Sequence, residues 1–278
     1  MNKRKALFLK RRSVRIQWIK NVLNNKRQKF VVAVIILSTG VFFSEHLFGN
    51  YNIFLLFFLA VFTNLLFFLS THSDVKGNFS PLIFILPFIY TFSFGLFYSL
   101  VPARFLTRVI ITSFYAVGLY SLFLSQNIFI VASIRTITLV SSAKIVSFIL
   151  TLVSYFFLLN IIFSLHLSAI PLSGLIFVFS FFLVSHSLWI HALSDKSIFS
   201  KFSWSFVLSL CLSEISLMLS FWPSTPTVIA LFLTGFFYTI VGITQVWLDK
   251  RLFKGVIWEY IWVAVIVLFI LILFTSWK

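Results

Sequence analysis

Acidic residues and cysteine are scarce in this chain. Of its 278 residues only six are Asp or Glu, and charged residues of both signs make up 10% of the sequence. Soluble domains carry about 25% charged and about 45–50% apolar residues, whereas 60% of this chain is hydrophobic and its mean hydropathy is +1.07. The low charge excludes an ordinary soluble protein and predicts an all-α, polytopic integral membrane helix bundle.

Cys211 is the single cysteine, and it falls within an apolar run. One thiol excludes an intramolecular disulfide and a cysteine-pair metal site. Catalytic motifs are missing as well, because the sequence contains no G-x-S-x-G, H-E-x-x-H, P-loop or G-x-G-x-x-G. Phe182 to His186 has an F-x-x-x-H spacing found in intramembrane CAAX-type proteases, but the E-E-x-x-x-R of that family is absent. We therefore expect no metal and no cofactor, and we favour a protein that is not an enzyme.

Long apolar runs are what the chain has in abundance. A helix needs about 20 apolar residues to cross a bilayer, and nine runs meet this length. They are 30–48, 53–70, 79–100, 106–126, 145–165, 171–191, 203–222, 226–248 and 258–276. Because short connections leave no room for a soluble domain, we expect residues 30–278 to form one transmembrane domain. The connection 127–144 is itself apolar, which predicts either two helices that run past the membrane face or a segment lying in the interface.

Basic residues are distributed unevenly. Eleven of the 22 Lys and Arg lie in residues 1–29, with no acid among them. This segment lacks the apolar run of a signal peptide. We predict a cytoplasmic arm that orients the first span and contacts anionic lipid, with a partner-binding segment as the alternative. If the amino terminus is inside, only Arg104, Arg108 and Lys278 fall outside, and the carboxyl terminus is also outside. Topology thus explains the net charge of +16 without a nucleic-acid partner.

The run 203–222 is the only predicted span with a carboxylate near its middle, Glu214. One stripe of this helix consists of serines, which are Ser205, Ser209, Ser213, Ser216 and Ser220. Glu214 points roughly the opposite way. A small-residue stripe favours a close helix neighbour, and a carboxyl inside a membrane needs a partner or a wet cavity. We therefore predict that this helix is packed on both sides near the centre of the bundle.

His186 and Asn64 are two more polar residues inside predicted spans. With Glu214 they form a candidate intramembrane polar site, which in a transporter would relay a proton or a substrate. The simpler interpretation of His186 is a hydrogen bond to a neighbouring helix. His186 and His191 are about 140° apart on a helix, so they do not form the i, i+4 pair of a helical zinc site.

The predicted topology places five ionisable residues near the outer surface: Glu45, His46, Arg104, Arg108 and His166. Arg104 and Arg108 are one turn apart at the start of a helix, where free backbone N–H groups favour an anion. They would contact ordinary headgroup phosphates or, in the sharper hypothesis, hold a specific lipid-linked phosphate. Glu45, His46 and His166 form either an outer polar cluster or a set of scattered interfacial residues.

Two patterns concern packing. Pro81 and Pro87 predict a bend in the third span. Gly235, Thr239 and Gly242 share one helix face, which predicts a close approach of another helix.

The last quarter of the chain carries a resemblance to known sequences. The matching blocks are Phe221-Trp-Pro, Ala230-Leu-Phe-Leu-Thr-Gly-Phe-Phe-Tyr238, Gly242 and Leu248-Asp-Lys-Arg-Leu-Phe-Lys-Gly-Val-Ile-Trp-Glu-Tyr260. They resemble an uncharacterised family of multi-spanning membrane proteins from candidate-phylum (Patescibacteria-type) bacteria. The resemblance implies a bacterial plasma membrane and adds no catalytic residue.

The sequence therefore does not identify the biochemical function. Three classes of protein are compatible with it: a transport protein, a membrane scaffold and a membrane enzyme. We favour a transport-like or membrane scaffold role. The alternative is a membrane enzyme or binding protein for an anionic lipid-linked substrate at the extracytoplasmic face.

Overall fold

The structure, a computed structural model, describes residues 26–48, 52–75, 80–101, 105–132, 139–191 and 198–275. Within these ranges the chain forms helices and no β-strand, and nine helices are long and apolar enough to cross a membrane. The prediction of an all-α bundle with nine spans is confirmed for this part of the chain. Residues 1–25, most of the predicted basic arm, lie outside the described residues.

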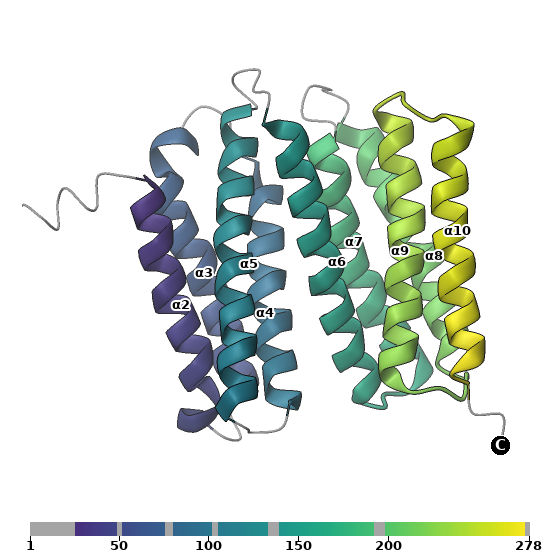
Figure 1. The fold of residues 1–278 in the computed structure, drawn as a ribbon, viewed down its shortest axis with the longest axis horizontal. Helices are drawn as coiled ribbons and strands as arrows, with labels where there is room; N and C mark the ends of the chain where they lie inside the picture. Colours follow the sequence, from purple (N-terminus) through teal and green to yellow (C-terminus); the bar gives the residue numbers. More distant parts are fainter. Residues whose placement is uncertain are drawn as a thin grey trace, which may run out of the picture.

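The elements follow one another with short connections. In chain order they are α2 (Lys26–Phe48), α3 (Asn52–Val75), the 3₁₀ helix η2 (Pro81–Phe84), α4 (Ile85–Leu100), α5 (Phe105–Ala132), α6 (Val140–Ser164), α7 (Ala169–His191), α8 (Ile198–Leu219), α9 (Pro226–Leu248) and α10 (Lys254–Leu273). Successive spans run in opposite directions, so α2 begins and α10 ends at opposite ends of the bundle (Figure 1).

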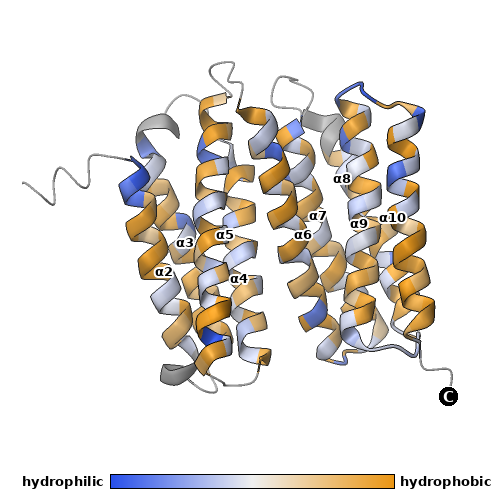
Figure 2. Ribbon diagram, viewed as in Figure 1, coloured by the Kyte–Doolittle hydropathy of each residue, from blue (hydrophilic) through white to orange (hydrophobic). Residues whose placement is uncertain are grey.

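Helices α4 and α6 lie at the centre of the bundle. Helix α4 packs against α3, α5 and α6, and α6 packs against α5, α7 and α9. Apolar residues cover the length of the helices, and hydrophilic ones gather mainly near their ends (Figure 2). Large apolar side chains face outward, including Phe54 at 77% exposure and Ile170 at 80%. Such a surface is unfavourable in water and is what hydrocarbon requires.

The apolar connection 127–144 is helical where the structure describes it. Helix α5 continues to Ala132 and α6 begins at Val140, so both extend beyond the limits expected at residues 126 and 145. Residues 133–138 lie outside the described part. The described residues therefore support two helices that run past the apolar spans.

The irregularity in the third span lies at its start. Pro81 opens η2, and Pro87 falls in the first turn of α4. Proline is tolerated there because the first N–H groups of a helix lack intrahelical acceptors. The N–H of Ile85 bonds to the carbonyl of Leu82, an i to i+3 contact. The expected bend is thus a change from 3₁₀ to α geometry.

The small-residue face of α9 packs against α10, as predicted. Thr239 Oγ1 lies 3.5 Å from the carbonyl oxygen of Tyr260. A methyl group added at Gly235 would lie 2.6 Å from Cγ2 of Val267, and one at Gly242 would overlap the ring of Tyr260. Both glycines are therefore required by the close approach of the two helices.

A buried hydroxyl network joins α3, α4 and α5. Thr63 Oγ1 lies 3.1 Å from Thr91 Oγ1, which lies 3.1 Å from the hydroxyl of Tyr115. The Tyr90 hydroxyl donates to the backbone carbonyl of Tyr115 at 3.2 Å. These bonds tie three spans together on the α2 side of the molecule.

Candidate functional site

A line of buried polar side chains runs between α5, α6, α7 and α9. We call it the polar seam, and its members are Gln126, Ser147, Tyr155, Ser180, His186, Ser187 and Gln245. Each is nearly or fully inaccessible to solvent. Buried polar groups in a bilayer must find partners within the protein, because hydrocarbon offers none. Among the buried polar residues of the described chain, the seam includes both glutamines and the one histidine.

His186 on α7 occupies the middle of the seam and is completely buried. Its Nδ1 lies 2.8 Å from the backbone carbonyl of Leu82 in η2, and its Nε2 lies 3.3 Å from Nε2 of Gln126 on α5. A carbonyl only accepts hydrogen bonds, so Nδ1 carries the proton and Nε2 accepts from the amide. The prediction that His186 hydrogen-bonds to a neighbouring helix is confirmed.

Gln126 connects α5 to both α6 and α7. Its amide nitrogen also lies 3.5 Å from Oγ of Ser147 on α6. Its Oε1 is buried and makes no hydrogen bond within the described chain, as is also true of Asn127 Oδ1 and Ser185 Oγ. Of these three atoms, Gln126 Oε1 belongs to a side chain that bonds to His186, Ser185 precedes His186 on α7, and Asn127 follows Gln126 on α5. Unsatisfied buried polar atoms are costly, which makes them notable in a membrane protein.

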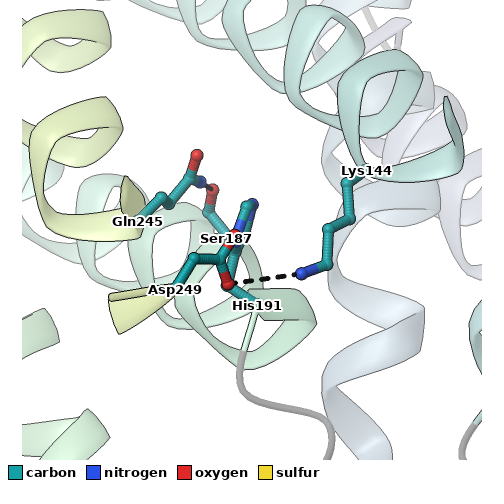
Figure 3. A network of polar contacts seen from close by, with 5 residues as sticks. All are labelled: Lys144, Ser187, His191, Gln245 and Asp249. Atoms are coloured by element: carbon teal, nitrogen blue, oxygen red, sulfur yellow. Dashed lines mark hydrogen bonds and ion pairs between the residues drawn. The ribbon is translucent and has the colours of Figure 1, made fainter. Parts of the chain in front are cut away.

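The seam ends in a charged cluster at the end of the bundle from which α2 begins (Figures 1 and 3). This end cluster consists of Lys144 at the start of α6, His191 at the end of α7 and Asp249 directly after α9. Lys144 Nζ lies 3.5 Å from Asp249 Oδ1, and His191 Nδ1 lies 3.1 Å from Asp249 Oδ2. One carboxylate thus joins three helix ends.

Gln245 and Ser187 form a buried hydrogen-bonded pair beside the end cluster. The Gln245 amide nitrogen donates to the Ser187 hydroxyl, one turn from His191 on α7 and one turn from Asp249 on α9. Further along, the Tyr155 hydroxyl lies 2.8 Å from Ser180 Oγ. On α7 the distance from His191 to Ser180 corresponds to a rise of about 16 Å. The seam therefore extends through about half of a hydrocarbon core that is about 30 Å thick.

The prediction for Glu214 is wrong in one respect. Ser205, Ser209 and Ser216 are buried as expected, on a helix that packs along α7. Glu214, however, is exposed rather than packed. The reason is topological: α8 lies at the edge of the bundle and contacts α7 and α9, so one face has no neighbour within the described chain.

The three residues of the candidate intramembrane site do not come together. Asn64 is half-buried on α3, which packs against α2, α4 and α5, whereas α8 packs against α7 and α9. Its Oδ1 is buried and makes no hydrogen bond within the described residues. His186 faces α5 and η2 instead of Glu214. These residues share a position inside predicted spans, which is what the sequence indicates. That position does not show which helices are neighbours.

The outer-surface candidates are described only in part. Arg104 and the side chains of Glu45 and His46 lie outside the described residues. Arg108 is half-buried in the first turn of α5. His166 is exposed after α6 with a φ of 47°, and its Nδ1 lies 2.8 Å from the carbonyl of Ser164. The anion site and the outer cluster therefore stay predictions.

Several residues of the seam were not identified from the sequence. Gln126 and Gln245 are amides inside apolar runs, as Asn64 is, and this signal marks them in the same way. Lys144 and Asp249 each lie beside the end of an apolar run, and no sequence pattern connects them. Their pairing depends on the packing of α6 against α9, which no local pattern predicts. Within the described residues no group of three His, Cys, Asp or Glu side chains could hold a metal ion.

Residues 31–274 match a family described as protein of unknown function (DUF5656). The chain belongs to this family. No curated protein and no solved structure matches it. The DUF5656 match covers all nine spans almost completely, so the polar seam lies entirely within the family region. The family description assigns no reaction.

Proposed function

We propose that this DUF5656 protein is a non-enzymatic transport protein that moves protons across the membrane, and that the polar seam forms the half of the path that begins at the end cluster. One observation supports the proposal: three buried hydrogen-bonded groups lie along α7 inward of the titratable end cluster, and one of them contains the fully buried His186. Polar and ionisable residues inside a membrane are costly and mark ion pathways or proton relays.

The surroundings of His186 suit a relay. Its neutral ring donates from Nδ1 to Leu82 and accepts at Nε2 from Gln126. A ring that gains a proton at Nε2 must donate there, and rotation of the Gln126 amide would present Oε1 as the acceptor. That oxygen makes no other hydrogen bond within the described chain. Both protonation states of His186 thus have a complete set of partners.

The proposal includes an orientation and a location. We place the end cluster on the cytoplasmic side, because the basic arm precedes α2 at that end. Residues 1–29 then contact anionic lipid, and residues 30–278 form the membrane domain with the carboxyl terminus outside. We assign the protein to a bacterial plasma membrane and its family to multi-spanning proteins of Patescibacteria-type bacteria, on the resemblance of its last quarter.

A scaffold role is the second candidate. It is favoured by the exposure of Glu214 on α8, since a carboxyl facing outward within a span suits contact with another protein. Binding of an anionic lipid-linked substrate is a third possibility that rests on Arg104 and Arg108. Native mass spectrometry tests it: a retained lipid of defined mass should disappear in Arg104→Ala/Arg108→Ala.

Proton flux into proteoliposomes tests the proposed function. Vesicles containing the purified full-length protein and an internal pH dye are given a potassium diffusion potential. We expect faster acidification than in protein-free vesicles, and we expect it to be slowed when His186 is replaced by Asn. Equal rates in protein vesicles and protein-free vesicles, with folding confirmed, would refute proton conduction and favour the scaffold.

A further inference from the structure

We propose that two copies of this chain associate through the exposed face of α8, with Glu214 of one copy hydrogen-bonded to Glu214 of the other. This proposal is independent of proton conduction, because the seam lies on other helices. It begins from the position of Glu214. The residue is exposed, and among the described residues no hydrogen bond or ion pair involves its carboxyl group.

The depth of Glu214 makes contact with water difficult. It lies within the apolar window Phe202–Leu219, five residues before the end of α8, which is a rise of about 8 Å. Trp222 lies beyond that end, so the headgroup level is further still. A glutamate side chain has only two methylene groups and cannot span this distance. Ionisable residues in spans almost always face protein or water-filled cavities, and a lipid-facing Glu214 would break this rule.

The face around Glu214 is a continuous stripe along α8. Its members recur at helical spacing and are all exposed: Val207, Leu210, Leu217, Met218 and Phe221. The opposite face carries the buried serines and packs against α7. The stripe is therefore a second packing surface of α8, apolar except for one hydrogen-bonding group near its middle.

A second copy is the occupant that the chemistry favours. Two copies inserted in the same orientation carry Glu214 at the same depth, and a two-fold axis along the membrane normal brings equivalent residues together. A carboxyl group both donates and accepts when it holds its proton, so two such groups satisfy one another. The described spans offer no basic side chain on this face. Self-association requires only groups that this chain itself supplies.

Single-molecule photobleaching of fluorescent full-length protein in liposomes measures the association. We expect a dimer population that rises with protein density. Glu214→Leu should weaken association by about five-fold or more, because it removes the hydrogen bonds between the paired carboxyl groups. Glu214→Gln should retain it, since amides also pair with each other. Purely monomeric protein, or dimers equally abundant in Glu214→Leu, would overturn the proposal.

Cross-linking identifies the face. In a Cys211→Ser background, Met218→Cys lies on the stripe, and Val265→Cys is an exposed control on α10. A short bis-maleimide should join two copies through Met218→Cys and not through Val265→Cys. Equal cross-linking at both positions would mean collision without a specific interface and would refute the proposal. A dimer cross-linked only through Val265→Cys would place the interface on α10, which also contradicts it.

Discussion

The imidazole of His186 on α7 donates a hydrogen bond of 2.8 Å to the backbone carbonyl of Leu82. The two residues are 104 positions apart in sequence. The bond joins the interior of one span to the 3₁₀ turn that begins another and that opens with Pro81. A proline-containing turn and a buried histidine, both recognisable in the sequence, thus form one structural unit.

Removing the imidazole should destabilise the bundle. His186→Leu leaves the Gln126 amide and one acceptor site of the Leu82 carbonyl without their partner. We expect the free energy of unfolding to fall by about 1–2 kcal/mol, measured by denaturant titration in detergent. The neighbouring Ser185→Ala is the matched control, because Ser185 Oγ is buried without a hydrogen bond in the described chain. It should be neutral or stabilising, and a larger loss at Ser185 than at His186 would contradict the assignment.

The ion pair of the end cluster should contribute modestly. Lys144 and Asp249 keep 20% and 32% of their side-chain surface exposed, so water screens their attraction. A double-mutant cycle with Lys144→Met and Asp249→Asn should give a coupling energy of about 0.5–1 kcal/mol. Lys250→Met next to Asp249 is exposed and should show no such coupling to Asp249. Zero coupling between Lys144 and Asp249 would refute their pairing in the membrane.

The close contact of α9 with α10 should require glycine at positions 235 and 242, where a side chain would collide with α10. Gly235→Ala introduces a methyl group against Val267 and should destabilise the fold by about 1–3 kcal/mol. Gly255→Ala in α10 meets no atom within 4 Å and should be neutral or slightly stabilising. Thermal unfolding in detergent compares the two. Similar midpoints for both variants would show that the helices do not approach closely at Gly235.

The orientation can be tested by labelling. With Cys211 replaced by Ser, single cysteines at Ser168 and Ser224 should react with an impermeant maleimide from outside the cell, because both lie between helices at the end opposite the start of α2. Cysteines at Ser142 and Gly255 should react only after permeabilisation. External labelling at Gly255 would reverse the proposed topology.

The sequence predicts the fold more fully than the site, for a physical reason. Nine spans follow from apolar length, which is a local property of the chain. The packing of α9 on α10 was also predictable, since Gly235, Thr239 and Gly242 mark a close approach. The seam depends on which helices become neighbours. The depth of a residue in the membrane and the periodicity of a helix do not predict this. Glu214 shows the same limit: its depth was recognised, but not that α8 lies at the edge of the bundle.

Proton flux through seam variants tests the central claim most directly. Gln126→Leu removes the amide that bonds to His186, while Thr63→Val removes a buried hydrogen bond of α3 that lies outside the seam. Both proteins are reconstituted in liposomes at equal density after their folding has been verified. We predict that Gln126→Leu abolishes the proton flux of the wild-type protein and that Thr63→Val retains it. Wild-type flux in Gln126→Leu, or equal loss in both variants, would contradict conduction through the seam.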